Sequence, residues 1–185
     1  MKRLFDIIAS LVLLILMSPL LIIVSIAISV ESKGPFIFRQ DRVGLNGKLF
    51  RINKFRSMFF TNNEPGSYYT EKNDHRITRV GRFIRDTSLD ELPQLINVLT
   101  GDMSIVGPRP DLLIQKTEYG AADWDLRNTV RPGITGLAQV SGRSNSTFEN
   151  RLHHDIEYAK THNFLLDLKI ILKTVQVVFL RKNLN

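Results

Sequence analysis

The feature that most constrains this chain is an uncharged, apolar run near its N-terminus, from Ile7 to Val30. The run is long enough for a helix to cross the hydrocarbon core of a bilayer. It is also longer than the apolar part of a secretion signal, and the residues after it, Glu31 to Pro35, offer no small-x-small cleavage site. The run therefore predicts a segment that stays in a membrane.

Pro19 divides this run into two halves of about eleven residues, each about 16 Å long as a helix and close to the depth of one leaflet. Its missing N–H leaves a carbonyl unpaired, for which the Ser18 hydroxyl is a candidate donor. Basic residues flank the run on both sides: Lys2, Arg3, Lys33, Arg39 and Arg42. Such flanks favour placing both ends in the cytoplasm. On these grounds a re-entrant helix that bends at Ser18-Pro19 and a single spanning helix both remain open.

Composition sets wider bounds. A chain of 185 residues with 43% hydrophobic content suits one compact domain. The formal charge of +7 indicates an anionic partner, which is a nucleic acid, an anionic bilayer surface or a polyphosphorylated substrate. The absence of cysteine excludes disulfides and thiolate metal sites and is compatible with a reducing cytoplasm.

The remaining patterns predict an α+β fold that is mainly helical, with a membrane anchor over residues 1–33 and one domain over 34–185. Residues 36–58 alternate, and Asn46-Gly47 at their centre predicts a type I′ hairpin. Lys54 and Arg56 are interpreted either as contacts to lipid headgroups or as a solvated strand edge. The polar stretch 61–75 predicts a mobile loop over the site. Helices are predicted over 79–85, 90–99, 111–119, 148–161 and 165–180.

An adjacent acid pair, Asp90-Glu91, lies where the second of these helices should begin. Ser88 and Glu91 have the spacing of a capping box, and Pro93 suits a first turn, so Ser88 or Asp90 is the predicted N-cap. The helix dipole alone would explain acids at this place. Arginines on both sides change the interpretation: Arg76, Arg79, Arg82 and Arg85 before the pair, and Arg109, Arg131 and Arg143 after it.

Four segments in order carry a resemblance: Ser88-Leu89-Asp90-Glu91-Leu92-Pro93-Gln94-Leu95, Gly101-Asp102-Met103-Ser104, Gly107-Pro108-Arg109-Pro110, and the stretch from Arg131 to Arg143. Together they resemble the bacterial sugar transferases known as small monotopic phosphoglycosyl transferases, from the first residues to about Lys182. Members of this family move a phospho-sugar from a nucleotide diphosphate sugar to a polyprenyl phosphate. The resemblance implies a re-entrant anchor broken at Ser18-Pro19, without the multi-span region of larger members, on the cytoplasmic face of the bacterial inner membrane.

The resemblance also implies roles for residues. Asp90 would attack the phosphorus that bears the sugar, release UMP and form an aspartyl-phospho-sugar, while Glu91 binds the metal or manages a proton. Mg²⁺ held by Asp90 and Glu91 suits the chemistry of diphosphates. Because arginine binds two phosphate oxygens at once, the candidate substrate-binding residues are Arg85, Arg109, Arg131 and Arg143. The expected partners are a UDP-sugar, polyprenyl (undecaprenyl) phosphate and membrane lipids, with no nucleic acid, and the apolar C-terminal helix permits a homodimer.

Two other functions stay open. A membrane-tethered nucleic-acid-binding or scaffold protein would explain the arginines, although Asp90-Glu91 would repel nucleic acid. A metal-dependent glycosyltransferase would release UDP instead of UMP. Asp123-Trp124-Asp125 matches the short Asp-x-Asp pattern of such enzymes, and His153-His154 lacks metal-ligand spacing. No residue pattern specifies the sugar.

Overall fold

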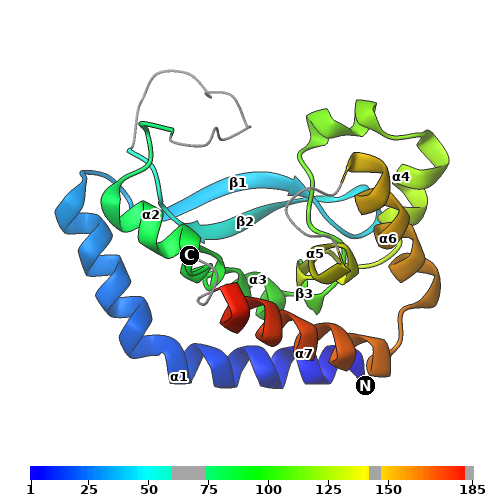
Figure 1. The fold of residues 1–185 in the computed structure, drawn as a ribbon, viewed down its shortest axis with the longest axis horizontal. Helices are drawn as coiled ribbons and strands as arrows, with labels where there is room; N and C mark the ends of the chain where they lie inside the picture. Colours follow the sequence, from blue (N-terminus) through cyan, green and yellow to red (C-terminus); the bar gives the residue numbers. More distant parts are fainter. Residues whose placement is uncertain (60–73, 142–146, 182–185) are drawn as a thin grey trace.

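The computed structural model describes residues 1–59, 74–141 and 147–181 and shows a mainly helical α+β fold (Figure 1). This confirms the predicted fold class. Most of the predicted loop 61–75 lies outside the described residues. The elements in chain order are α1 (Lys2–Glu31), β1 (Ile37–Val43), η1 (Leu45–Gly47), β2 (Leu49–Phe55), α2 (Arg79–Asp86), η2 (Leu89–Glu91), α3 (Gln94–Thr100), β3 (Ser104–Val106), η3 (Leu113–Glu118), α4 (Ala121–Arg127), β4 (Gly133–Thr135), α5 (Leu137–Ser141), α6 (Phe148–Thr161) and α7 (Phe164–Arg181).

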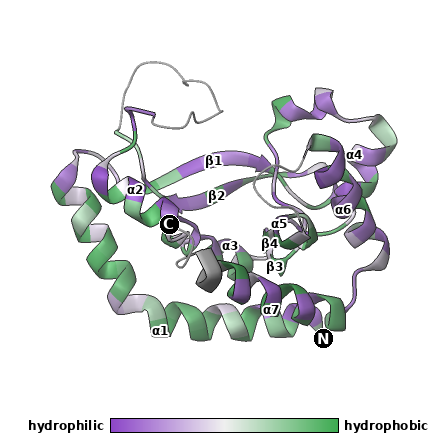
Figure 2. Cartoon of the chain, in the orientation of Figure 1, coloured by the Kyte–Doolittle hydropathy of each residue, from purple (hydrophilic) through white to green (hydrophobic). Residues whose placement is uncertain are grey.

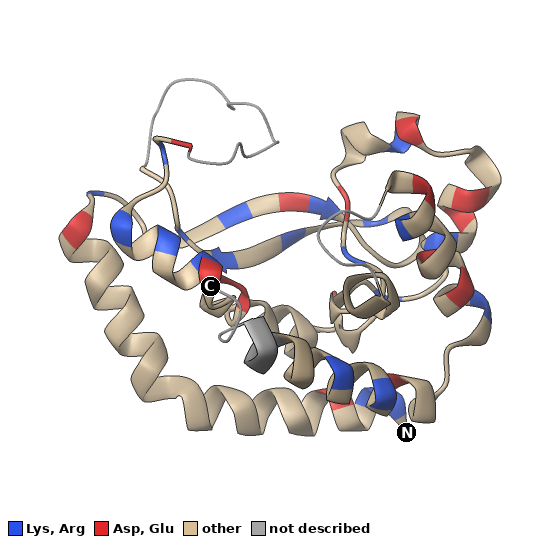
Figure 3. Ribbon diagram, in the orientation of Figure 1, with Lys and Arg blue, Asp and Glu red and all other residues tan. Residues whose placement is uncertain are grey.

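The N-terminal run forms a single helix, α1, which bends near its middle (Figure 1). Pro19 lies inside it, and the Ser18 hydroxyl donates a hydrogen bond to the Ile15 carbonyl at 2.8 Å. That carbonyl is the one that the missing N–H of Pro19 leaves without a partner, so the predicted role of Ser18 is confirmed. Among the described helices, α1 alone is long and apolar enough to cross a membrane. Figure 2 shows hydrophobic residues along most of its length, and Figure 3 shows charges only near its two ends.

Both ends of α1 are bound to the same domain. At the N-terminal end, Lys2 Nζ lies 2.6 Å from Asp167 Oδ2 of α7, and the buried Asp6 accepts a hydrogen bond from Ser104 Oγ at 2.8 Å. At the C-terminal end, Arg56 donates to the carbonyl oxygens of Ser32 at 2.7 Å and Lys33 at 3.0 Å. The two ends of α1 therefore contact the same domain at two separate places.

Arg56 corrects an expectation from the sequence. Only 5% of the Arg56 surface is exposed, so the side chain faces neither lipid headgroups nor solvent. Its guanidinium satisfies carbonyls at the end of α1, which otherwise lack intrahelical partners. Next to it, Val24 and Ile28 of α1 pack against Phe55 and Ile84. Arg56, which directly follows β2, thus joins the hairpin to α1.

The predicted hairpin is confirmed. β1 and β2 pair antiparallel with Val43 opposite Leu49, and Asn46 (φ 54°) and Gly47 (φ 76°) both take the positive φ that a type I′ turn requires. Ile52 of β2 packs against Val98 and Met103. The hairpin is therefore attached through its core face to α3, the helix that follows the acid pair.

The helix predicted over 90–99 is wrong at its start. η2 ends at Glu91 and α3 begins at Gln94, while Ser88 takes a left-handed conformation and its side chain caps nothing. The predicted capping box is therefore wrong, because a positive φ at Ser88 turns the chain before the acids. The predicted helix 148–161 is confirmed as α6, and the predicted helix 165–180 is confirmed as α7 within one residue at each end. In place of the helix predicted over 111–119, the structure has the shorter 3-10 helix η3. The parallel pair β3–β4 and the helices α4 and α5 were not predicted.

Candidate active site

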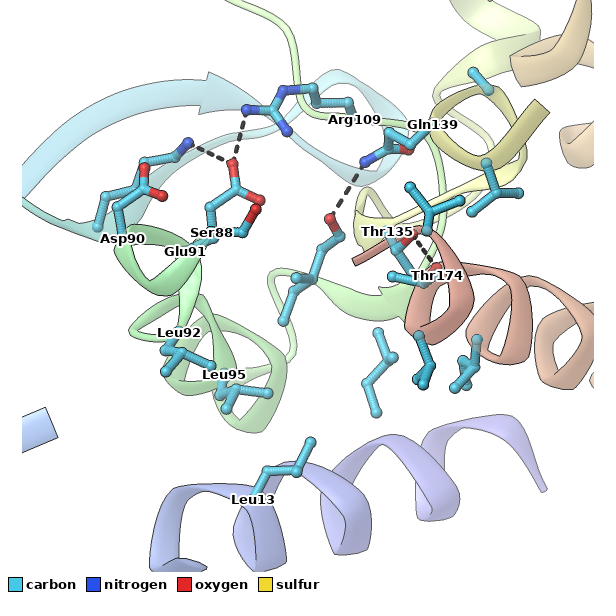
Figure 4. A pocket seen from close by; sticks show the side chains of 18 of the residues that line it. Leu13, Ser88, Asp90, Glu91, Leu92, Leu95, Arg109, Thr135, Gln139 and Thr174 are labelled. Atoms are coloured by element: carbon cyan, nitrogen blue, oxygen red, sulfur yellow. Dashed lines mark hydrogen bonds and ion pairs between the residues drawn. The ribbon is translucent and has the colours of Figure 1, made fainter. Parts of the chain in front are cut away.

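A cavity of about 690 Å³ lies above α1, between η2, α3, α5 and α7 (Figure 4). One end is charged and is lined by Lys54, Arg85, Asp90, Glu91 and Arg109. Apolar side chains line much of the rest, among them Leu13, Leu92, Leu95, Ile105, Ile134, Ile171 and Val175. Polar side chains of Thr135, Gln139, Arg151, Asp155 and Thr174 also line it. The acid pair thus faces a space that also borders the apolar helix α1.

Glu91 is held between two cations. Its Oε1 accepts hydrogen bonds from Lys54 Nζ at 2.9 Å and from Arg109 Nη2 at 2.8 Å (Figure 4), and its side chain is 18% exposed. Burial raises the pKa of Glu91, but Arg109 and Lys54 outweigh this effect and hold its pKa at about 2. Glu91 is therefore ionised at neutral pH, and its carboxylate positions both cations at the cavity wall.

Asp90 has a different environment. Burial, and then the neighbouring charge of Glu91, raise the pKa of its carboxyl above the usual value, while Lys54, Arg85 and Arg109 oppose this shift. Within the described part of the chain, no group donates a hydrogen bond to its carboxylate. Asp90 thus presents to the cavity a carboxylate without a hydrogen-bonded protein partner, beside the three cations Lys54, Arg85 and Arg109.

The structure separates the four candidate arginines. Arg85, in the last turn of α2, and Arg109 line the cavity. Arg131 is directed elsewhere, since its Nε donates to the carbonyl of Gly101 at 2.9 Å. Arg143 lies outside the described residues. The structure therefore places two of the four beside the acid pair.

The glycines near Arg131 serve close packing of backbone. A Cβ on Gly133 would collide with the backbone of Gly107, because β4 pairs in parallel with β3 and the residue after β3 lies against it. A Cβ on Gly136 would likewise collide with the carbonyl oxygen of Gly107. These glycines allow the Gly107-Pro108-Arg109 segment to pass close to β4, and so they set the path of the chain into Arg109.

A buried ionic network lies behind Arg109. Arg127 of α4 is 2% exposed; its Nε lies 2.9 Å from Asp155 Oδ2 and its Nη1 lies 3.0 Å from Asp111 Oδ2. Tyr119 also donates to Asp111 Oδ2 at 2.6 Å. The remaining nitrogen, Nη2, donates to the backbone carbonyl of Arg109. The network therefore fixes the residue whose side chain holds Glu91.

Sequence reasoning missed Lys54 and Arg127 as parts of this site. Lys54 lies on β2, and the strand pattern alone does not show that the tertiary fold brings it to Glu91. Arg127 lies in a helix that periodicity did not reveal.

Two other sequence patterns lie away from this site. Asp125 of the Asp-x-Asp pattern lines a separate, smaller cavity with Asn46 and Lys116, and His154 pairs with Glu157 at the surface.

The described residues contain no cluster of three or more acidic, histidine or cysteine side chains that would hold a metal alone. Mg²⁺ instead often binds one or two carboxylates and takes its other oxygen ligands from substrate phosphates and water. Asp90, whose carboxylate has no protein partner, fits that mode, with Glu91 next to it. The donor set thus suits a metal that arrives with a diphosphate.

The candidate site is thus a carboxylate among cations, in a cavity beside an apolar helix. The profile of the bacterial sugar transferase family matches residues 1–181, and the chain belongs to this family.

Three relatives with 41–47% identity illustrate the comparison. A UDP-glucose:undecaprenyl-phosphate glucose-1-phosphate transferase of Klebsiella pneumoniae is 47% identical over 98% of this chain and 41% of its own length. A protein of the same name from Caulobacter vibrioides is 45% identical over 94% of this chain and 68% of its own length. A UDP-N-acetylgalactosamine-undecaprenyl-phosphate N-acetylgalactosaminephosphotransferase of Aeromonas hydrophila is 41% identical over 96% of this chain and 43% of its own length. The chain thus spans well under half the length of two of these relatives.

Proposed function

We propose that this protein transfers a sugar 1-phosphate from a UDP-sugar to polyprenyl phosphate and releases UMP, as the first membrane step in assembling a glycan. The observation that carries the proposal is the Asp90 carboxylate, which faces the cavity without a protein partner beside Lys54, Arg85 and Arg109. The names of the relatives support the substrate class. They differ in the sugar, which therefore stays open for this chain.

In the proposed reaction, an oxygen of the Asp90 carboxylate attacks the phosphorus that bears the sugar. The bond between this phosphorus and the bridging oxygen breaks, and UMP leaves with the electron pair. Arg85, Arg109 and Lys54 stabilise the charge on the phosphate oxygens. An oxygen of polyprenyl phosphate then attacks the same phosphorus, which yields the lipid-linked diphosphate sugar and restores the carboxylate. Asp90 and Glu91 would hold Mg²⁺, which supplies neutralisation of phosphate charge.

The arrangement of α1 supports a re-entrant anchor over residues 1–33 and a catalytic domain over 34–185. A spanning helix would carry its two ends to opposite sides of a core about 30 Å thick. Here Lys2 and Asp6 at one end and Ser32 at the other bind the same domain. We therefore place the protein on the cytoplasmic face of the bacterial inner membrane, where lipids meet the exposed side of α1.

Topology gives a first test. Tags at Met1 and at Asn185 are both expected to be inaccessible from outside intact cells, because both ends of α1 bind one domain. Replacing Ser18 and Pro19 with leucine restores a regular helix and is expected to lower activity about 10²-fold by misplacing the site. Labelling of the Met1 tag from outside would contradict the re-entrant topology.

The released nucleotide tests the function itself. Purified protein is given polyprenyl phosphate and each of a panel of UDP-sugars, and the nucleotide product is identified. UMP is expected with at least one sugar. UDP as the product would favour a glycosyltransferase that moves the sugar without its phosphate. Tight, salt-sensitive binding to duplex DNA, with no nucleotide released, would favour the nucleic-acid-binding alternative.

A further inference from the structure

Ser88 has an unusual backbone conformation. Its φ of 57° and ψ of 17° lie in the left-handed region, where a residue with a Cβ is disfavoured. Its N–H donates to the Arg85 carbonyl at 3.1 Å, and its own carbonyl accepts from the Glu91 N–H at 3.3 Å. The residue thus ends α2 and begins η2, and this turn brings Arg85 and the acid pair to one cavity.

Other described residues with a positive φ are of types that adopt this conformation more easily than serine. Asn46 is the other residue besides glycine with a positive φ, and asparagine is among the residues that tolerate it. At the end of α3 the same region is occupied by Gly101. Ser88 has neither advantage. Strained backbone of this kind is concentrated at functional sites in native proteins.

The Ser88 side chain is placed to have a role in such a site. It lines the cavity together with Arg85, Asp90 and Glu91, and Figure 4 shows it beside Glu91. Across residues 1–59, 74–141 and 147–181, the structure gives its hydroxyl no hydrogen bond, and it caps no helix. A hydroxyl on the wall of this cavity, two residues from Asp90, is therefore available to a ligand.

We propose that Ser88 is a further substrate-binding residue, whose hydroxyl donates a hydrogen bond to a non-bridging oxygen of the phosphate that Asp90 attacks. This inference rests on the proposed function. A serine hydroxyl is a good donor to an anionic oxygen, and such charge-assisted bonds are the stronger ones. Serine at this position thus combines a turn that aims Asp90 with a contact to the group that Asp90 attacks.

Two substitutions separate the side chain from the backbone. Ser88→Gly removes the hydroxyl and relieves the strain, whereas Ser88→Ala removes the hydroxyl and keeps the strain. We expect both variants to lose about 10- to 100-fold in kcat/KM for the UDP-sugar, with similar values for the two. Ser88→Gly should melt at or above the temperature of the parent. Asn46→Gly, at the other strained position and outside the cavity, should keep full activity.

The result that would overturn the proposal is a Ser88→Gly protein as active as the parent with only Ser88→Ala impaired, since backbone conformation alone would then explain the serine. A defect that high Mg²⁺ abolishes would also overturn it, by assigning the hydroxyl to the metal. Failure of the proposed function is distinguishable, because the parent itself would then release no UMP.

Discussion

Replacing Asp90 with asparagine is expected to abolish turnover, with a loss of at least about 10³-fold in kcat, while the protein stays folded. Asparagine has nearly the same size as aspartate, and no described residue depends on the Asp90 carboxylate for a hydrogen bond. An amide, however, cannot attack a phosphorus as a carboxylate does. The measurements are steady-state release of UMP and the melting temperature of both proteins in the same detergent.

Asp86→Asn is the matched control. Asp86 is an exposed acid at the end of α2, four residues earlier, and it does not line the cavity. Its substitution is expected to change kcat by less than about twofold, as for a surface position away from the site. Substantial turnover by Asp90→Asn would remove Asp90 from the role of nucleophile.

The largest effect on stability is expected for Arg127→Met. The substitution leaves Asp111 and Asp155 buried without their cation and removes the donor to the Arg109 carbonyl. Breaking a buried ion pair from one side costs about 3–5 kcal/mol. The free energy of unfolding, measured by denaturant titration, should fall by that amount, and any folded fraction should have reduced activity because Arg109 is no longer fixed.

Arg51→Met is the control for this change. Arg51 pairs with Asp41 at 3.5 Å in the same structure, but both side chains are more than 60% exposed. Exposed pairs contribute about 0–1 kcal/mol, so the loss of stability should be small. Equal stability of Arg127→Met and the parent would show that the network does not hold the domain together.

The sequence predicted those structural features that depend on residues close together in the chain. The Ser18 bond across the Pro19 gap joins atoms three residues apart, the hairpin turn follows from Asn46-Gly47, and helix 148–161 follows from its own spacing. Asp90 and Glu91 were identified from their motif, and the structure places both at one cavity. Their roles in catalysis stay predictions.

Contacts distant in sequence were not predictable in this way. Lys54 binds a carboxylate 37 residues away, and Arg127 reaches the Arg109 carbonyl 18 residues away, on a helix too short for a clear period. Arg131, in the resemblance-bearing segment, binds Gly101 in this structure. Ser88 matched a capping pattern but took the left-handed conformation, because the chain turns between α2 and the acids. Spacing alone does not carry that information.

The most direct test of the account is a single-turnover measurement with a UDP-sugar that the panel identifies, in the absence of polyprenyl phosphate. A covalent intermediate on Asp90 predicts release of at most about one equivalent of UMP per active site. It also predicts a protein whose mass is increased by one sugar phosphate, with both signals absent in Asp90→Asn. Glu91→Gln should still be labelled if Glu91 serves the second half-reaction. Release of UMP only when both substrates are present, with no adduct on the protein, would contradict the account and favour direct attack by the lipid phosphate.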